Sequence, residues 1–211
     1  MSRVDQLIAE HCPDGVPFEP VAEVFETRTG YTPSKADPAN WRAGTVPWFR
    51  MDDIRTNGRI LFDSLQHVSE KAVKRGGTYP ADSIVMSTLA TIGEHALIKV
   101  PFLANQQLTI LSVKPAYAER IDPKFAYYYC FKLGEWCRKN TKTASVPSVD
   151  MAGFKRFRFP LPPLEVQREI VEILDQFASL EAELESELDA RRRQHEHYRR
   201  ILLAFAEVPN D

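Results

Sequence analysis

Polar side chains that can hydrogen-bond to base edges or pair with phosphates gather in four short segments of the sequence. Reading a nucleic acid requires amide, guanidinium and hydroxyl groups at the bases and cations at the phosphates. The segment Arg138–Ser145 is basic and rich in hydroxyls, which favours phosphate contacts first and base contacts second. The candidate contact residues in the four segments are Thr32, Ser34, Lys35, Lys71, Lys74, Arg75, Asn105, Gln106, Arg138, Lys139, Lys142 and Ser145.

These polar segments also have plainer interpretations. The run Asn105-Gln106-Gln107 supplies amides suited to adenine, but amides that bond the backbone of their own loop fit the sequence equally well. The basic segments 71–75 and 138–145 are also compatible with solvated loops. Tyr31 and Trp48 are interpreted as turn or core packing rather than as intercalating side chains. The sequence leaves the alternatives for the polar segments open.

The motifs of common catalytic and metal sites are absent from the sequence. It has no Gly-x-Gly-x-x-Gly, P-loop, His-Glu-x-x-His or Gly-x-Ser-x-Gly motif. His195 and His197 stand two residues apart in a helical pattern, so their rings point to different sides and do not share a metal ion. Asp52 and Asp53 are adjacent, and extended backbone would turn their carboxylates apart. We expect a non-catalytic protein with no metal and no cofactor of its own.

The last fifth of the chain has the pattern of one long helix. Pro162-Pro163 opens a periodic segment that continues to Phe205, with apolar steps of three and four and one 4-4 step at Leu184–Leu188. Such spacing is typical of a coiled-coil seam. About 43 residues with a rise of about 1.5 Å make a rod of roughly 64 Å, too long for one compact domain to cover. We call its predicted partner-facing residues the apolar seam: Ile170, Ile173, Phe177, Leu180, Leu184, Leu188, Tyr198, Leu202 and Phe205.

Charge divides along the same helix. Residues 164–190 hold nine acidic residues and one basic residue, whereas residues 191–206 hold five arginines and one glutamate. A parallel pair of such helices would place acid beside acid, but an antiparallel pair places the acidic half beside the basic half. We therefore expect two copies to pair antiparallel, with their globular domains at opposite ends. The alternative is that these charges only form a solvated face.

Composition indicates one globular domain with an appendage. The chain has 211 residues, of which 44% are hydrophobic. Residues 1–163 carry 21 Lys and Arg against 17 Asp and Glu, and this net charge of +4 permits polyanion binding without requiring it. The three cysteines form no Cys-x-x-Cys pair, and neither a signal peptide nor a membrane-spanning apolar run occurs. We expect reduced thiols and a cytoplasmic protein.

The predicted fold class is α+β, a globular mixed domain followed by one long coiled-coil helix. A helix is expected at 122–138, where Asp122-Pro123 is a start signal. Apolar runs predict strands at 46–50, 83–87, 96–100, 108–113 and 157–159. The expected boundaries are a globular domain at 1–160, a spacer and dimerisation helix at 161–206 and a short tail at 207–211.

Four segments of the sequence together resemble one protein family. They are Gly30-Tyr31-Thr32-Pro33-Ser34, then Ile84-Val85-Met86-Ser87 leading into Thr91-Ile92-Gly93-Glu94, then Ala104-Asn105-Gln106-Gln107, and finally Phe159-Pro160-Leu161-Pro162-Pro163-Leu164-Glu165-Val166-Gln167-Arg168-Glu169-Ile170. Each short segment alone is a weak signal, whereas Pro-Pro-Leu-x-x-Gln at the start of a long helix is more specific. In this order, and over residues 18–205, they resemble the specificity (S) subunit of type I DNA restriction-modification systems.

The resemblance implies a target recognition domain at 1–160 that binds double-stranded DNA. It also implies a spacer helix that is bound by methyltransferase (modification) subunits. Complete members of the family carry two such domains and two antiparallel helices, which read the halves of a split site. This sequence holds one of each, so the resemblance implies a half-subunit that forms a homodimer and reads a split palindromic site. The partner subunits would use S-adenosylmethionine, and ATP and Mg if a restriction subunit is present.

Other interpretations of the sequence remain open. The first half of a longer protein fits it as well as a natural half-subunit does. A coiled-coil assembly module that binds protein or a small ligand, without a DNA role, is the alternative function. A third interpretation is an enzyme whose site is assembled from residues distant in sequence. The sequence alone predicts neither the bases that are recognised nor the distance between the halves of a split site.

Overall fold

The computed structural model describes residues 3–142 and 145–205. The chain divides into two compact units, Met1–Glu169 and Ile170–Asp211, which we call unit 1 and unit 2. Among the described residues, all strands lie in unit 1. The last helix begins in unit 1 and provides the helical part of unit 2.

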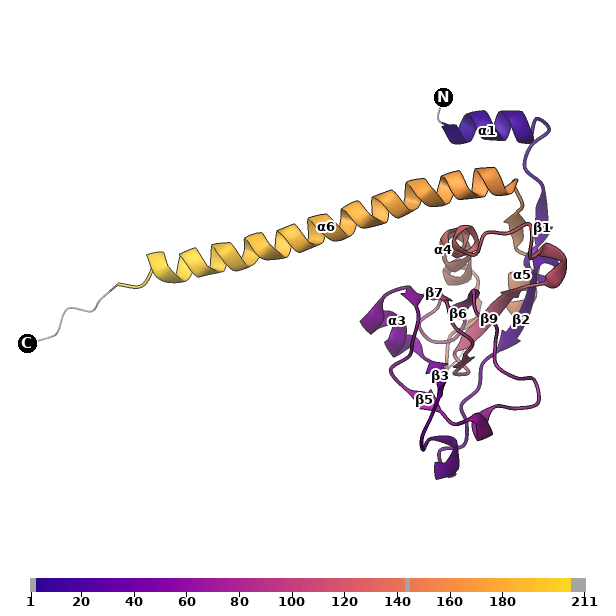
Figure 1. Cartoon of the computed structure of the whole chain (residues 1–211), viewed down its shortest axis with the longest axis horizontal. Helices are drawn as coiled ribbons and strands as arrows, with labels where there is room; N and C mark the ends of the chain where they lie inside the picture. Colours follow the sequence, from indigo (N-terminus) through magenta and orange to yellow (C-terminus); the bar gives the residue numbers. More distant parts are fainter. Residues whose placement is uncertain (1–2, 143–144, 206–211) are drawn as a thin grey trace, which may run out of the picture. The chain divides into compact units, whose positions relative to one another are not determined.

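Six α-helices and twelve strands make up the described structure (Figure 1). The helices are α1 (Arg3–His11), α2 (Val21–Val24), α3 (Met51–Asn57), α4 (Pro123–Lys139), α5 (Met151–Arg156) and α6 (Leu164–Leu202), with the 3-10 turns η1 (Pro38–Asn40), η2 (Glu70–Ala72) and η3 (Pro115–Tyr117). The strands are β1 (Phe18–Pro20), β2 (Phe25–Thr29), β3 (Val46–Phe49), β4 (Ile60–Leu61), β5 (His67–Val68), β6 (Ser83–Ser87), β7 (His95–Ile98), β8 (Leu103–Ala104), β9 (Leu108–Val113), β10 (Thr141–Lys142), β11 (Ser148–Val149) and β12 (Arg158–Pro160).

The main sheet of unit 1 has five strands in the order β2-β9-β6-β7-β4. β9 pairs antiparallel with both neighbours, so that Ile110 lies opposite Arg28 on one side and Val85 on the other. Side chains of β6, β7 and β9 are buried on both faces of the sheet. This double burial explains why their sequences are continuous apolar runs rather than alternating ones. α4 packs against β6 and β7 (Figure 1).

A smaller sheet, in the order β5-β3-β8, carries the polar loops of unit 1. β3 pairs antiparallel with β5 and parallel with β8. Trp48 and Phe49 of β3 lie in one core cluster with Phe102 and with residues of β6, β7 and β9. The rings of Phe49 and Phe102 meet edge to face, with centroids 5.6 Å apart. The shared core therefore fixes the base from which the loops project.

The α+β fold class predicted from the sequence is confirmed. The strands at 83–87 and 108–113 have the predicted bounds, because each is a short apolar run flanked by polar residues. α4 begins after Asp122, whose carboxylate accepts hydrogen bonds from the backbone N–H groups of Lys124 and Phe125.

The expectation of extended backbone at Asp52 and Asp53 is wrong. Both residues lie in α3, where the carboxylate of Asp53 accepts the backbone N–H of Arg50 and closes the first turn. The polar segment 138–145 also contains part of a regular element, because its strand β10 pairs antiparallel with β11.

α6 confirms the predicted long helix and ends at Leu202, three residues before Phe205. The expected tail at 207–211 lies outside the described residues. Within unit 2 the apolar seam is open to solvent at Phe177, Leu180, Leu184, Leu188, Tyr198, Leu202 and Phe205. Unit 2 therefore presents an uncovered apolar stripe.

The Pro-Pro-Leu-x-x-Gln element attaches the start of α6 to the rest of unit 1 through Gln167. The side chain of Gln167 is fully buried. Its Oε1 accepts the backbone N–H of Asp122 at 2.9 Å, and its Nε2 donates to the carbonyls of Arg120 at 2.8 Å and Pro162 at 2.7 Å. One amide thus satisfies three backbone groups and holds the start of α4 beside the start of α6.

Replacing Gln167 with alanine is expected to lower the free energy of unfolding by about 2–4 kcal/mol, because buried backbone groups lose their partners. Urea unfolding followed by circular dichroism measures the change. Gln176→Ala is the matched control, since Gln176 is an exposed residue of the same helix. Its effect should stay below about 0.5 kcal/mol. Equal stabilities of the two variants would contradict the role of Gln167.

Candidate nucleic-acid interface

The loop after β2 lies directly against the loop between β8 and β9. The backbone N–H of Gly30 donates to the carbonyl of Leu108 at 3.0 Å, and that of Tyr31 donates to the carbonyl of Ala104 at 2.7 Å. The hydroxyl of Thr32 then donates to Oε1 of Gln106 at 2.5 Å. Two candidate residues that are 74 positions apart in the sequence are therefore direct neighbours.

Tyr31 connects this pair of loops to the basic segment around Lys74. Its hydroxyl donates to the carbonyl of Ala72 at 2.8 Å and accepts the backbone N–H of Lys74 at 3.1 Å. The ammonium group of Lys74 lies 4.0 Å from the centroid of the Tyr31 ring, a cation–π contact. The prediction that Tyr31 serves turn packing is confirmed. Three candidate segments meet around Tyr31, and we call them the loop surface: Thr32, Ser34, Lys35, Lys71, Lys74, Arg75, Asn105 and Gln106.

The amides of the loop surface differ in what they bond. Oδ1 of Asn105 accepts the backbone N–H of Gln107 at 3.2 Å, and its Nδ2 donates to Oε1 of Gln107 at 3.3 Å. Asn105 thus braces its own loop, which is the alternative that the sequence left open. Gln106 is exposed, and its amide bonds only the hydroxyl of Thr32 among the described groups. Gln106 is therefore the better placed of the two to contact a base.

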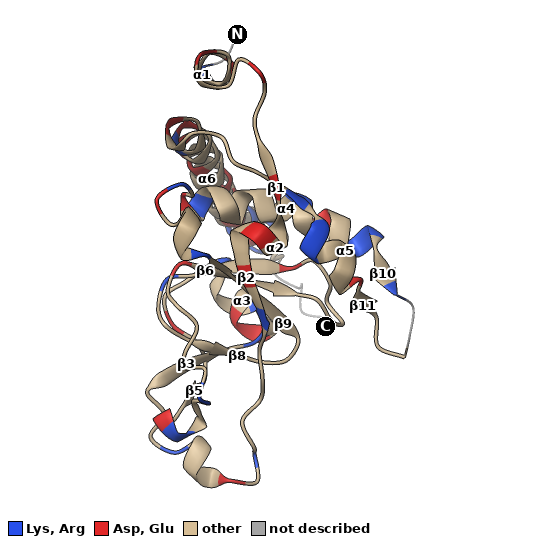
Figure 2. Ribbon diagram, turned by 90° about the vertical axis from the view of Figure 1, so that its right-hand side faces the viewer, with Lys and Arg blue, Asp and Glu red and all other residues tan. Residues whose placement is uncertain are grey.

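A second group of candidates lies at the end of α4, and we call it the basic cluster: Arg138, Lys139, Lys142 and Ser145. All four are exposed. Nζ of Lys142 lies 3.5 Å from Oδ1 of Asp150, an exposed ion pair that leaves Lys142 able to turn to another anion. Figure 2 shows the Lys and Arg residues of α5 on the same side of unit 1 as β10, which contains Lys142. Thr143 and Ala144 of the same segment lie outside the described residues.

Thr88 links the loop surface to the basic cluster. Its backbone N–H donates to the carbonyl of Gln107 at 3.1 Å, and its carbonyl accepts the backbone N–H of Val149 at 3.0 Å. Val149 belongs to β11, which pairs with the β10 residue Thr141. The two groups of candidate residues are thus joined through two backbone hydrogen bonds. They can form adjoining parts of one interface.

Buried titratable groups offer little to a reaction at neutral pH. Burial raises the pKa of the Cys137 thiol to about 12 and raises the pKa of Cys130 as well, so both thiols stay protonated. Burial lowers the pKa of His95 to about 4, so its ring stays neutral. All three cysteines are buried, and none forms a disulfide. No group of three His, Cys, Asp or Glu side chains in the described part of the chain is arranged to hold a metal ion.

A hollow of about 430 Å³ opens beside Lys35, at the end of the loop surface. Trp41, Arg42, Trp48, Arg50 and Gln66 also line it. No recognisable motif surrounds Arg50 or Gln66 in the sequence. Of the residues that line the hollow, Trp41 could have been noticed in the sequence, because a tryptophan in a polar segment indicates a packing partner elsewhere in the chain.

Comparison with known proteins decides the family. The type I restriction modification DNA specificity domain matches residues 13–190. The type I restriction enzyme EcoprrI specificity subunit of Escherichia coli is 54% identical over 220 residues, which cover 98% of this chain and 54% of that protein. The chain belongs to the type I restriction-modification specificity family. Specificity subunits of these systems are non-catalytic.

One further relative is similar in sequence, and two solved structures are similar in fold. The EcoR124I/EcoR124II specificity subunit of Escherichia coli is 34% identical over 90% of this chain and 48% of its own length. A chain of a solved type I R-M system superposes with a TM-score of 0.70 at 19% identity, over 92% of this chain and 48% of that one. The HsdS subunit from Thermoanaerobacter tengcongensis gives 0.63 at 19% identity, over 87% and 44%. The chain spans about half the length of these relatives.

The helices that the structure describes are also unsuited to a bilayer. Within residues 3–142 and 145–205, none combines the length and apolarity that a membrane span requires.

Replacing Gly30 with alanine is expected to disrupt the loop surface. A Cβ at this position would overlap the backbone carbonyls of Ala104 and Asn105, so one of the two loops must move. We expect a loss of more than about 2 kcal/mol in the free energy of unfolding, measured in urea.

Gly58→Ala is the control for the Gly30 substitution. Gly58 has a φ of +84° but nothing within 4 Å of an added Cβ, so only backbone strain of about 1 kcal/mol is expected. A Gly30→Ala variant no less stable than Gly58→Ala would show that the loops do not meet as described.

Proposed function

We propose that this chain is a DNA sequence-recognition subunit of a type I restriction-modification complex, acting as a half-subunit in the cytoplasm. The observation that carries the proposal is the 54% identity to a specificity subunit over 98% of the chain. Residues 1–160 recognise double-stranded DNA, and the segment that contains α6 serves as the spacer and dimerisation element. The methyltransferase subunits bring S-adenosylmethionine chemistry, and a restriction subunit, where present, brings the chemistry that uses ATP and Mg.

The loop surface and the basic cluster supply the DNA contacts of the proposed function. Their cations neutralise phosphates, which gives affinity irrespective of sequence. Exposed amides and hydroxyls beside those cations, such as Gln106 and Ser34, are able to bond base edges. The link through Thr88 supports a single interface, because it holds both groups at a fixed separation.

The apolar seam supports pairing with a second copy of the chain. In unit 2 the seam residues from Phe177 to Phe205 face solvent, and an isolated helix gains no burial from them. The acidic first half and the basic second half of α6 are complementary when a second copy runs antiparallel. Because the two recognition domains of such a homodimer are identical, the DNA site would be a palindrome interrupted by a spacer. In a longer chain, a second helix in the same molecule would take the same place.

Removing the lysines of the basic cluster tests the DNA role. With Lys139→Ala and Lys142→Ala combined, the complex with methyltransferase subunits should bind its DNA more weakly. The slope of log affinity against log salt should shrink by about two units, one for each lost phosphate contact. Fluorescence anisotropy at several salt concentrations gives both values. The control combines Lys124→Ala and Lys132→Ala, which removes the same charge from earlier turns of α4. If both double variants behave as the wild type does, the basic cluster lies outside the interface.

Cysteine crosslinking tests the antiparallel pairing. A cysteine replacing Ile170 in one copy and one replacing Leu202 in a second copy should crosslink, because antiparallel helices bring these positions together. The native cysteines are buried and should not compete. Each variant oxidised alone is the control. Crosslinks formed only between two copies of the Ile170→Cys variant would indicate parallel helices and reject this arrangement.

A further inference from the structure

The hollow beside Lys35 combines the groups that nucleic-acid recognition uses. Three cationic side chains, Lys35, Arg42 and Arg50, stand around two indole rings and one amide, Gln66. Among the described residues that line it, none is acidic. Lys35 also belongs to the loop surface, so the hollow continues the proposed DNA interface toward β3 and β5.

The aromatic wall of the hollow is fixed by hydrogen bonds. The rings of Trp41 and Trp48 meet edge to face with centroids 5.2 Å apart. The indole N–H of Trp41 donates to the carbonyl of Ser34, and that of Trp48 donates to the carbonyl of Tyr31, both at 3.0 Å. Neither ring can turn without losing a bond, so the wall is preorganised and tied to the loop surface.

Arg50 contributes a guanidinium group that is only partly paired. Its Cζ lies 5.4 Å from the centroid of the Trp48 ring. Its Nη1 lies 3.8 Å from the exposed carboxylate of Asp52, too far for a strong hydrogen bond. Its Nε has no hydrogen-bond acceptor in the described structure. The guanidinium group therefore keeps positive charge available to an anionic ligand.

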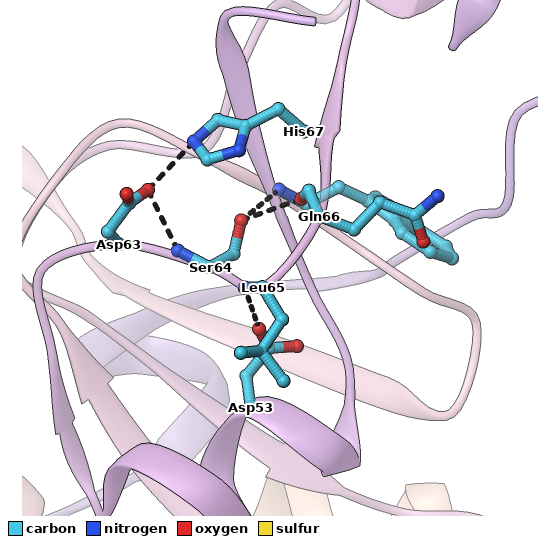
Figure 3. Close-up of polar contacts among 7 residues, drawn as sticks. Asp53, Asp63, Ser64, Leu65, Gln66 and His67 are labelled. Atoms are coloured by element: carbon cyan, nitrogen blue, oxygen red, sulfur yellow. Dashed lines mark hydrogen bonds and ion pairs between the residues drawn. The ribbon is translucent and has the colours of Figure 1, made fainter.

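Gln66 projects from a loop whose backbone is clamped (Figure 3). The carbonyl of Gln66 accepts the backbone N–H of Trp48 at 3.0 Å and the hydroxyl of Ser64 at 2.7 Å. The side-chain amide points away from Asp53 and Asp63 (Figure 3), and no hydrogen bond from it occurs among the described residues. A fixed backbone with an unengaged amide is what direct readout of a base edge requires.

The buried carboxylate of Asp53 holds the backbone on two sides of the hollow, at Arg50 and at Leu65. Oδ2 of Asp53 accepts the backbone N–H of Arg50 at 2.7 Å, and Oδ1 accepts the backbone N–H of Leu65 at 2.6 Å. Leu65 immediately precedes Gln66 in the sequence, so Asp53 couples the position of the guanidinium group to that of the amide. Asp53 is fully buried, which makes it a positioning residue without contact to a ligand.

We propose that Gln66 is a sequence-reading residue that contacts an adenine of the target through its amide, while Arg42 and Lys35 bind the adjoining phosphates. Gln bonds the N6 and N7 atoms of adenine in a bidentate manner, and the surrounding cations hold the backbone that presents this base. The inference rests on the proposed DNA function and deepens it, because it assigns base readout to a residue outside the loop surface and the basic cluster.

Selection of binding sites from a randomised double-stranded DNA pool tests the inference. The complex of this chain with its methyltransferase subunits is compared as wild type, Gln66→Ala, Gln66→Glu and the control Gln6→Ala. Gln6 is an exposed residue of α1, and Figures 1 and 2 show α1 at the opposite end of unit 1 from β5. Gln66 makes no side-chain hydrogen bond that folding needs, so its variants are expected to fold.

The expected result is a change at one base pair of each half-site. Gln66→Ala should lose about 5- to 150-fold preference for adenine there, and Gln66→Glu should move the preference toward cytosine, whose amino group a carboxylate accepts. Arg42→Ala should weaken all sequences equally and reduce the salt slope by about one. An unchanged motif in both Gln66 variants, beside a wild type that selects one, overturns this inference alone. A wild-type complex that selects no motif overturns the proposed function, and the inference with it.

Discussion

An apolar seam that one helix cannot bury is the constraint on which this molecule depends. Burying a leucine or phenylalanine side chain contributes about 1.5–3 kcal/mol. In unit 2 the seam offers Phe177, Leu180, Leu184 and Leu188 to solvent. A helix in this state is marginal by itself, and a counterpart of similar length converts it into a stable rod. The division of charge along α6 then favours an antiparallel counterpart, which would separate two recognition domains by a fixed distance.

A second feature of the molecule is the set of hydrogen bonds that attaches the start of α6 to the rest of unit 1. Gln167 satisfies three backbone groups at once, including the N–H of Asp122 just before α4. α4 in turn packs on β6 and β7, and its end carries the basic cluster. The start of α6 and the basic cluster are thus both supported by α4. Within unit 1, packed and hydrogen-bonded elements thus connect the first residues of α6 to the candidate interface.

Local patterns made much of this fold predictable, and long-range contacts account for what they left out. The α6 helix, the Asp122 cap and the strands β6 and β9 follow from periodicity and turn signals within a few residues. α3 does not, because its start depends on a carboxylate, Asp53, that also bonds a loop twelve residues away. The sequence placed Asp53 as one of an adjacent acidic pair and gave no sign of that second partner.

Residue types in the candidate interface were predictable, but their grouping was not. No local sequence pattern predicts that Thr32 contacts Gln106 or that Tyr31 contacts Lys74. Both contacts join residues that are far apart in the sequence. Gln66 carries no local signal, because its importance comes from a backbone held by Ser64 and Trp48 and from an amide left unengaged.

Sedimentation equilibrium of the purified chain at micromolar concentration tests most directly whether α6 requires a counterpart. Pairing through the apolar seam predicts a mass twice the 24.1 kDa of one chain, which falls to the single-chain value when Leu184 is replaced by glutamate. A wild-type mass of 24.1 kDa at every concentration would contradict pairing between copies of this chain.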